Sequence, residues 1–209
     1  MADKGGMVPA LVEFLAEVTG EPASTLGQIA RRTREAGYLS QAGHGRAGAK
    51  ATSRDAATIL LVSMATNTAI HAGAVVEALS ALERQAWGPG GGESPEKLAG
   101  LDVEATDPIS AVAEIIDAVR RRDVNFKEIE YLQIITRGDP HVAISWGDDV
   151  DAHSWHFSAP EKSEALGRYR RVAHLSGTAS SGTKLRHIVR AEGWILEYLA
   201  DWLEGRETD

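Results

Sequence analysis

The feature that most constrains this chain is a pair of short helical patterns separated by a four-residue stop. Apolar residues recur every three or four positions through residues 8–19, with acidic residues on the opposite side, which predicts an amphipathic helix. The run Thr19-Gly20-Glu21-Pro22 ends that helix, and a second helix is expected to begin at Ser24 or Thr25, since both are good N-cap residues. Gly37 is expected to end it. The residues expected to face inward are Leu11, Phe14, Leu15 and Val18 in the first helix and Leu26, Ile29, Ala30 and Thr33 in the second.

A glycine-rich basic segment, residues 41–50, separates this pair from a third helix. Its glycines let the backbone turn sharply and approach a phosphate closely. The run Thr52-Ser53-Arg54-Asp55 resembles a capping box with Asp in place of Glu, so the third helix is expected to start there. That helix, or a successor, is expected to run toward Trp87. The order helix, turn, helix, glycine-rich wing and helix predicts a winged helix-turn-helix.

The distribution of charge supports nucleic-acid binding although the whole chain is acidic. The net charge of −8 divides into −3 over residues 1–21, +5 over residues 22–54 and −10 over residues 55–209. Phosphate contact depends on the local field rather than on the total charge. The basic region therefore predicts double-stranded DNA as the partner, with the second helix in the major groove, which is wide enough to admit a helix.

The residue types on the outer face of the second helix suit this role. Gln can pair with adenine, Arg with guanine, and Ser or Thr with a phosphate or a base edge. Glu35, at the far end, is expected to point away from the phosphates, and the wing is expected to add charge and a histidine hydrogen bond. The predicted DNA-binding residues are Ser24, Thr25, Gln28, Arg31 and Arg32 in the helix, and His44, Arg46, Lys50 and Arg54 in and after the wing.

Four short runs between Leu15 and Met64 carry a family resemblance. They are Leu15-Ala16-Glu17-Val18-Thr19-Gly20, Ser24-Thr25-Leu26, Glu35-Ala36-Gly37-Tyr38-Leu39, and Ser53-Arg54-Asp55 leading into Leu60-Leu61. In these runs the chain is similar to the DNA-binding domain of MerR-type regulators, although Gly27 stands where that family usually has Arg. The resemblance implies a winged helix-turn-helix that binds DNA, and it does not extend to metal or drug sensing. The whole chain also resembles uncharacterised helix-turn-helix proteins of phage and prophage-like regions.

The glycine- and proline-rich run Gly88–Pro95 is the clearest break in the chain. We therefore expect a DNA-binding domain with an extended third helix at residues 7–87 and a linker at residues 88–106. Residues 107–209 are expected to form an α+β domain for oligomerisation or partner binding.

Within this second domain, local signals predict a helix followed by a hairpin. Asp107-Pro108 supplies an N-cap and a proline at the first helical position, and Ile109, Val112, Ile116 and Val119 are expected to face inward. Residues 129–136 and 141–147 are rich in β-branched and aromatic residues on either side of Gly138-Asp139-Pro140, which predicts two antiparallel strands.

The remaining C-terminal segments complete an α+β fold. Residues 154–158 are expected to add a strand, and Arg168–Leu175 could add another. Lys184–Leu203 is expected to be helical, with a break or bend at Gly193. The fold class is thus an N-terminal winged helix-turn-helix, a small helix-plus-hairpin domain and a C-terminal helix. Trp194, Tyr198 and Trp202 recur along that last helix, which fits a core helix better than a dimer interface.

Several other chemistries are not expected. The chain has no cysteine, which excludes disulfides, a thiolate nucleophile and cysteine-based zinc sites. His141, His153 and His156 lie near Asp148, Asp149 and Asp151 in the sequence. His153 and His156 should point to opposite faces of a strand, so no metal site is expected. No nucleophile–base arrangement stands out, and we expect neither enzymatic activity nor a cofactor. No signal peptide or membrane span is recognised, so a cytoplasmic protein is expected.

The sequence therefore favours a sequence-specific DNA-binding protein, a transcriptional regulator that acts as a homodimer or higher oligomer. One alternative is a small terminase subunit, which recognises DNA for phage packaging. A second alternative is a protein-interaction module whose helix-turn-helix does not bind DNA.

Overall fold

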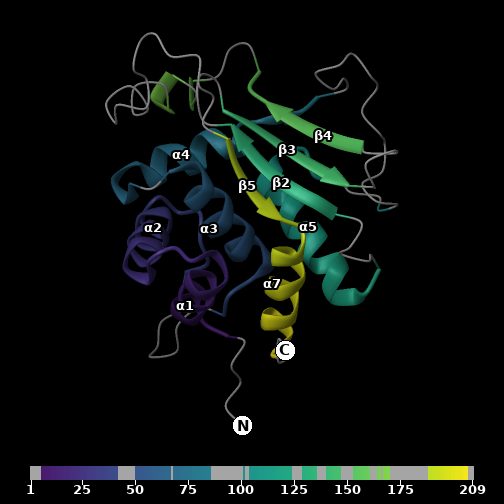
Figure 1. Ribbon diagram of the computed structural model, residues 1–209. Coiled ribbons are helices and arrows are strands. Elements are labelled where there is room, and N and C mark those ends of the chain that lie inside the picture. Colours follow the sequence, from purple (N-terminus) through teal and green to yellow (C-terminus); the bar gives the residue numbers. More distant parts are fainter. Residues whose placement is uncertain are drawn as a thin grey trace.

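The computed structural model shows a mixed helix and strand protein (Figure 1). The residues that the structure describes are 6–41, 50–66, 68–85, 101, 104–123, 129–135, 140–146, 153–160, 164–165, 167–169 and 188–206. The predicted α+β class is confirmed, since helices and an antiparallel sheet occur in one chain.

The N-terminal half is helical. Its elements are α1 (Val8–Thr19), α2 (Ala23–Glu35), α3 (Ser53–Ala65), the short 3-10 helix η1 (Ala69–His71) and α4 (Ala72–Ser80). Each of the first two helices ends at a glycine with positive φ. Gly20 (φ 74°) follows α1, and Gly37 (φ 85°) follows α2 just beyond its C-cap. A left-handed residue after a helix favours glycine because glycine has no Cβ to clash. The first helix and its stop therefore lie where the sequence predicts them.

The third helix does not extend toward Trp87 as one element. It ends at Ala65, and the helical segment that follows is turned by 119° relative to it. Thr66 takes an extended conformation, and its hydroxyl accepts a hydrogen bond from the backbone N–H of Thr68 at 3.1 Å. A threonine hydroxyl that satisfies a nearby N–H offers the backbone an alternative to a further helical turn. The successor helix is α4.

The sheet is antiparallel throughout, in the order β1-β4-β3-β2-β5. Its strands are β1 (Glu83–Arg84), β2 (Ile129–Ile135), β3 (His141–Trp146), β4 (His153–Ser158) and β5 (Ile188–Glu192). The predicted hairpin is confirmed by the pairing of β2 with β3, and the predicted strand at 154–158 is confirmed as β4. Helix α5 (Pro108–Arg121) begins at Asp107 as predicted, with the Asp107 carboxylate accepting from the N–H groups of Ile109 and Ser110.

Two expectations for the C-terminal part are wrong. Residues 188–192 form strand β5 rather than helix, whereas the expected break at Gly193 and the helix after it, α7 (Trp194–Glu204), are confirmed. Backbone groups of β5 pair with the neighbouring strand β2, so β5 becomes an edge strand of the sheet. Residues 168–169, the start of the expected strand Arg168–Leu175, are helical, with Tyr169 buried and Arg168 ion-paired with Glu77 of α4. The rest of the Arg168–Leu175 segment lies outside the described residues.

A single hydrophobic core joins the helices to the sheet. In Figure 1, α3 and α5 lie behind one face of the sheet, and α7 follows directly from β5. The sheet contributes alternate residues to this core, among them Val142 and Ile144 of β3 and Trp155 and Phe157 of β4. Strand β1 pairs with β4 even though residues 88–106 separate them in sequence. Most of that predicted linker lies outside the described residues.

Among the described residues, no single helix is both long and apolar enough to cross a membrane.

Candidate nucleic-acid interface

Helix α2 separates its residues into a buried and an exposed face as the sequence predicts. Leu26, Ile29, Ala30 and Thr33 are each at most 3% exposed and pack into the core. The Thr33 hydroxyl donates to the carbonyl of Ile29 at 2.8 Å, so this buried polar group is satisfied within the helix. The buried face packs against α1, α3, η1 and α4, and the opposite face is directed outward.

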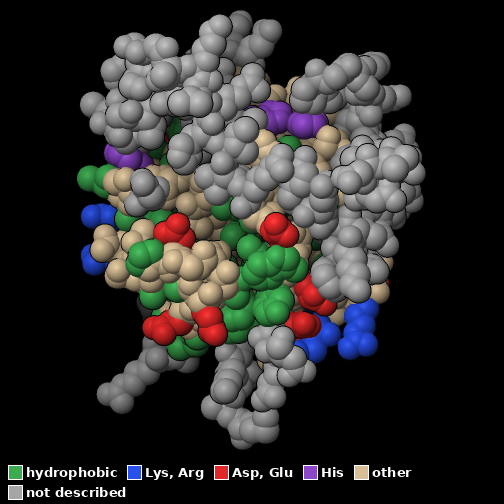
Figure 2. All heavy atoms as spheres, viewed as in Figure 1, with side chains coloured by type: hydrophobic (Ala, Val, Ile, Leu, Met, Phe, Trp, Pro, Cys, Tyr) green, Lys and Arg blue, Asp and Glu red, His purple; other side chains and the backbone are tan. Residues whose placement is uncertain are grey.

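The exposed face of α2 carries the predicted helix contacts. Residues exposed to solvent on it are Ser24, Gln28, Arg31, Arg32, Arg34 and Glu35, while Thr25 is partly buried. Arg34 was not among the predicted contacts, although its exposure places it beside Arg31 on the helix surface. Figure 2 shows Lys and Arg side chains at the edge of the molecule that holds α2, and acidic side chains both over the helical half and over α7.

The two predicted arginines of α2 share one acidic partner. Arg31 Nε lies 2.9 Å from Glu35 Oε1, and Arg32 Nη1 lies 2.9 Å from Glu35 Oε2. These hydrogen bonds, from Arg31 first and Arg32 second, hold the pKa of Glu35 below its ordinary value. Because the side chains of Arg31 and Arg32 are 76% and 54% exposed, solvent screens the pairs and a phosphate can replace the carboxylate. The sequence predicts that Glu35 points away from the phosphates and does not predict that it pairs with Arg31 and Arg32.

The start of α2 differs from the prediction. Pro22 is the N-cap, the helix begins at Ala23, and no side chain caps it. The Pro22 carbonyl accepts from the N–H groups of Thr25 and Leu26, at 2.9 and 3.1 Å. The proline ring fixes its own φ near the helical value, here −59°, so the chain enters the helix one residue earlier than Ser24. Ser24 and Thr25 therefore lie in the first turn instead of serving as caps.

A single buried carboxylate holds both ends of the predicted wing. Asp55 is 2% exposed, and its Oδ1 accepts from the N–H of Ser40 at 2.8 Å. Its Oδ2 accepts from the N–H and the hydroxyl of Thr52, both at 2.8 Å. The predicted capping box is thus confirmed, and it also connects α3 to the chain that leaves α2. The contact with Ser40 was not predicted, because nothing local indicates a partner 15 residues away.

The predicted wing contacts are only partly described. His44 and Arg46 lie outside the described residues. Lys50 is exposed and forms an isolated antiparallel bridge with Met7, and the N–H of Ala51 donates to the carbonyl of Gly6 at 2.7 Å. Residues 50–51, at the end of the predicted wing, are therefore paired with the chain that precedes α1.

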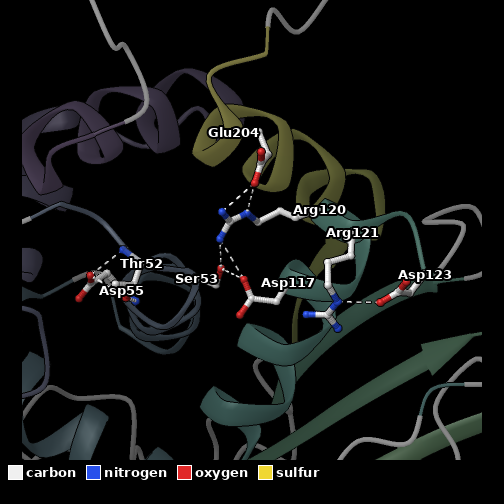
Figure 3. A network of polar contacts seen from close by, with 8 residues as sticks. All are labelled: Thr52, Ser53, Asp55, Asp117, Arg120, Arg121, Asp123 and Glu204. Atoms are coloured by element: carbon white, nitrogen blue, oxygen red, sulfur yellow. Dashed lines mark hydrogen bonds and ion pairs between the residues drawn. The ribbon is translucent and has the colours of Figure 1, made fainter.

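Arg54 and its neighbours in α3 are directed toward α5. Arg54 Nη1 donates to the Ser110 hydroxyl at 2.8 Å, so the structure places this predicted contact against the first turn of α5 rather than beside α2. The residue before it, Ser53, donates to Asp117 Oδ1 at 2.5 Å. This contact belongs to a larger polar network (Figure 3).

Arg120 is the centre of that network and connects three helices. It donates through Nη1 to Asp117 at 3.0 Å and to Ser53 of α3 at 3.3 Å. Its Nε and Nη2 lie 2.8 and 2.7 Å from Glu204 Oε1 in α7. These bonds hold the pKa of Glu204 below its ordinary value, and the charge of Lys50 contributes in the same direction. The network therefore connects the start of α3 with the C-terminal helix.

A second polar cluster lies on the sheet. His141 Nε2 and His156 Nδ1 are 2.8 Å apart, and His156 Nε2 lies 2.7 Å from the Ser154 hydroxyl. Burial lowers the pKa of His156. Within the part of the chain that the structure describes, no group of three or more His, Asp or Glu side chains is arranged to hold a metal ion.

Neither known protein families nor curated proteins nor solved structures give a match to this chain. The function is therefore argued from the surfaces described above.

Proposed function

We propose that the chain is a double-stranded DNA-binding protein that places α2 in the major groove. The observation that supports this best is the exposed face of α2, where hydroxyl, amide and guanidinium groups stand opposite a fully buried apolar face. A helix supported from behind by four other helical elements is rigid enough to present these groups to base edges and phosphates.

Charge favours the same face. Residues 22–54 carry a net charge of +5 in a chain of net charge −8. Three arginines of this region, Arg31, Arg32 and Arg34, lie on α2. Phosphate contacts supply most of the affinity of such proteins, while Gln28 and the first-turn residues would read bases. Arg31 and Arg32 pair with the Glu35 carboxylate in the free protein. On binding, phosphate oxygens would replace that carboxylate as the partner of both guanidinium groups.

Within this proposal the protein acts as a cytoplasmic transcriptional regulator of MerR-like or phage type, as a homodimer or higher oligomer. Residues 41–50 form its wing, and Arg46 and Lys50 contact the DNA backbone. The second candidate is a protein-interaction module, and it is favoured by the pairing of Arg31 and Arg32 with Glu35, since this pairing reduces the net charge of the α2 face.

A mobility-shift assay with genomic DNA fragments distinguishes the two candidates. The parent protein should shift DNA, and Arg31→Ala or Arg46→Ala should weaken the shift by about fivefold to tenfold, as loss of a charge-assisted phosphate contact implies. Arg121→Ala is the matched control, because Arg121 is exposed at the end of α5 and pairs with Asp123. No shift by the parent protein, or equal shifts by all variants, would reject DNA binding through α2.

A further inference from the structure

A groove lies between the helical half and the C-terminal helix, beside the turn that joins α1 to α2. Its volume is about 300 Å³, and it is lined by the end of α1, the C-terminal half of α3, and the β5–α7 junction. The apolar residues among its lining are Val18, Leu60, Met64, Trp194 and Ile195. Three separate elements thus contribute to one concave apolar surface.

Trp194 is the exposed part of this surface. It is 38% exposed, and few large apolar side chains among the described residues are as accessible. Its ring packs edge-on against Tyr198, with 5.3 Å between ring centroids, and this contact restrains the Trp194 side chain. One further turn along α7, Trp202 stacks on Phe14 of α1 at 5.6 Å. A rigid, partly exposed aromatic residue beside an apolar groove is typical of an interface anchor.

The rim of the groove is acidic. Glu21 and Glu192 both line it and both are exposed, and its described lining contains no lysine or arginine. Glu17, also exposed, lies one residue before Val18 on α1. Figure 2 shows the apolar side chains gathered over α7 with acidic side chains around them. The groove therefore combines an apolar floor with negative potential at its edge.

We propose that this groove binds an amphipathic segment of a partner protein, with an apolar side chain against Trp194 and lysine or arginine residues facing Glu21 and Glu192. Charge complementarity decides the occupant. A second copy related by twofold symmetry would bring the same acidic rim against itself, which is unfavourable. An anionic membrane surface would be repelled for the same reason. This proposal is independent of DNA binding by α2.

The test uses a fluorescein-labelled helical peptide of leucine and lysine, with leucines on one face, followed by fluorescence anisotropy. A matched peptide carries glutamate in place of every lysine. The lysine peptide should bind saturably with one site per chain, and the glutamate peptide should not bind. Trp194→Ala should weaken binding by about tenfold, as loss of an interface anchor implies.

Charge-reversed variants separate binding in the groove from general attraction to an acidic protein. Glu192→Lys should weaken binding of the lysine peptide by about fivefold or more, because it replaces attraction with repulsion at the rim. Glu83→Lys makes the same change of charge at an exposed position on β1 and should alter binding by less than about twofold. Circular dichroism confirms that each variant is folded.

Three results would overturn the proposal. They are absence of saturable binding, equal weakening by Glu192→Lys and Glu83→Lys, and sedimentation that shows self-association which Trp194→Ala abolishes. The last result would assign the groove to a second copy of this chain.

Discussion

Arg31 and Glu35 face each other across one turn of α2, with 2.9 Å between Arg31 Nε and Glu35 Oε1. Arg32 binds the other oxygen of the same carboxylate. Glu35, the acidic residue in this basic stretch of sequence, therefore competes with the proposed DNA phosphates for the two arginines.

Removing this competitor should strengthen DNA binding. Glu35→Gln retains the size of the side chain and releases Arg31 and Arg32 from their ion pairs, so the affinity for DNA should rise by about threefold at low salt. Glu13→Gln on the exposed side of α1 removes the same charge without touching an arginine and should have a smaller effect. Fluorescence anisotropy with labelled duplex DNA measures both, and equal affinities of Glu35→Gln and the parent protein would show that the pairs do not compete.

Arg120 should contribute much more to stability than its sequence neighbour Arg121. Arg120→Ala removes bonds to Asp117, Ser53 and Glu204, and it should lower the free energy of unfolding by about 1–2 kcal/mol. The side chain of Arg121 is 62% exposed and pairs with Asp123, so Arg121→Ala should change it by less than about 0.5 kcal/mol. Urea denaturation followed by tryptophan fluorescence provides the comparison. Similar losses in both variants would contradict a stabilising role for the network.

Two glycines, one within α2 and one just after it, should respond to alanine in opposite ways. A Cβ at Gly27 in α2 would meet only Val12 Cγ1, at 3.9 Å, which is an ordinary contact. Gly27→Ala should therefore stabilise the protein by about 0.5–1 kcal/mol, because glycine is a poor helix former. Gly37 has φ 85°, so Gly37→Ala should destabilise it by about 1 kcal/mol. Thermal unfolding measures both changes, and a lower melting temperature for Gly27→Ala would show that α2 needs its glycine.

The His156 cluster predicts a loss of stability in weak acid. Burial lowers the pKa of His156 below its ordinary value of 6.5, so the unfolded chain takes up the proton before the folded chain does. The free energy of unfolding should therefore fall as the pH drops below about 6.5, until the folded-state pKa is passed. His156→Gln should reduce this pH dependence in denaturation curves recorded between about pH 7 and 5. A variant whose stability follows the same curve as the parent protein would exclude His156 as a cause.

Features encoded by neighbouring residues could be predicted from sequence. The helix of residues 8–19, the buried face of α2, the capping box at Thr52 and the Asp107 N-cap each depend on side chains within a few positions of one another. Helical periodicity and capping chemistry are sufficient for such features.

Features that depend on distant partners could not be predicted. Ile188 and Val189 fit an inward helical face as well as a strand, and only pairing with β2, more than 50 residues earlier, decides between them. The bond from Ser40 to Asp55 and the contact of Arg120 with Glu204 span 15 and 84 residues. At the candidate interface, the sequence indicated the exposed residues of α2 but missed the partners that hold Arg31, Arg32 and Arg54.

The salt dependence of DNA affinity tests the central claim most directly. The affinity of the parent protein for duplex DNA should fall steeply as salt rises, since each phosphate contact releases counterions. Arg31→Ala and Arg32→Ala should each reduce the slope of log affinity against log salt by about one unit. Binding that is absent, or that keeps the same slope in both variants, would contradict the proposal that α2 contacts the DNA backbone.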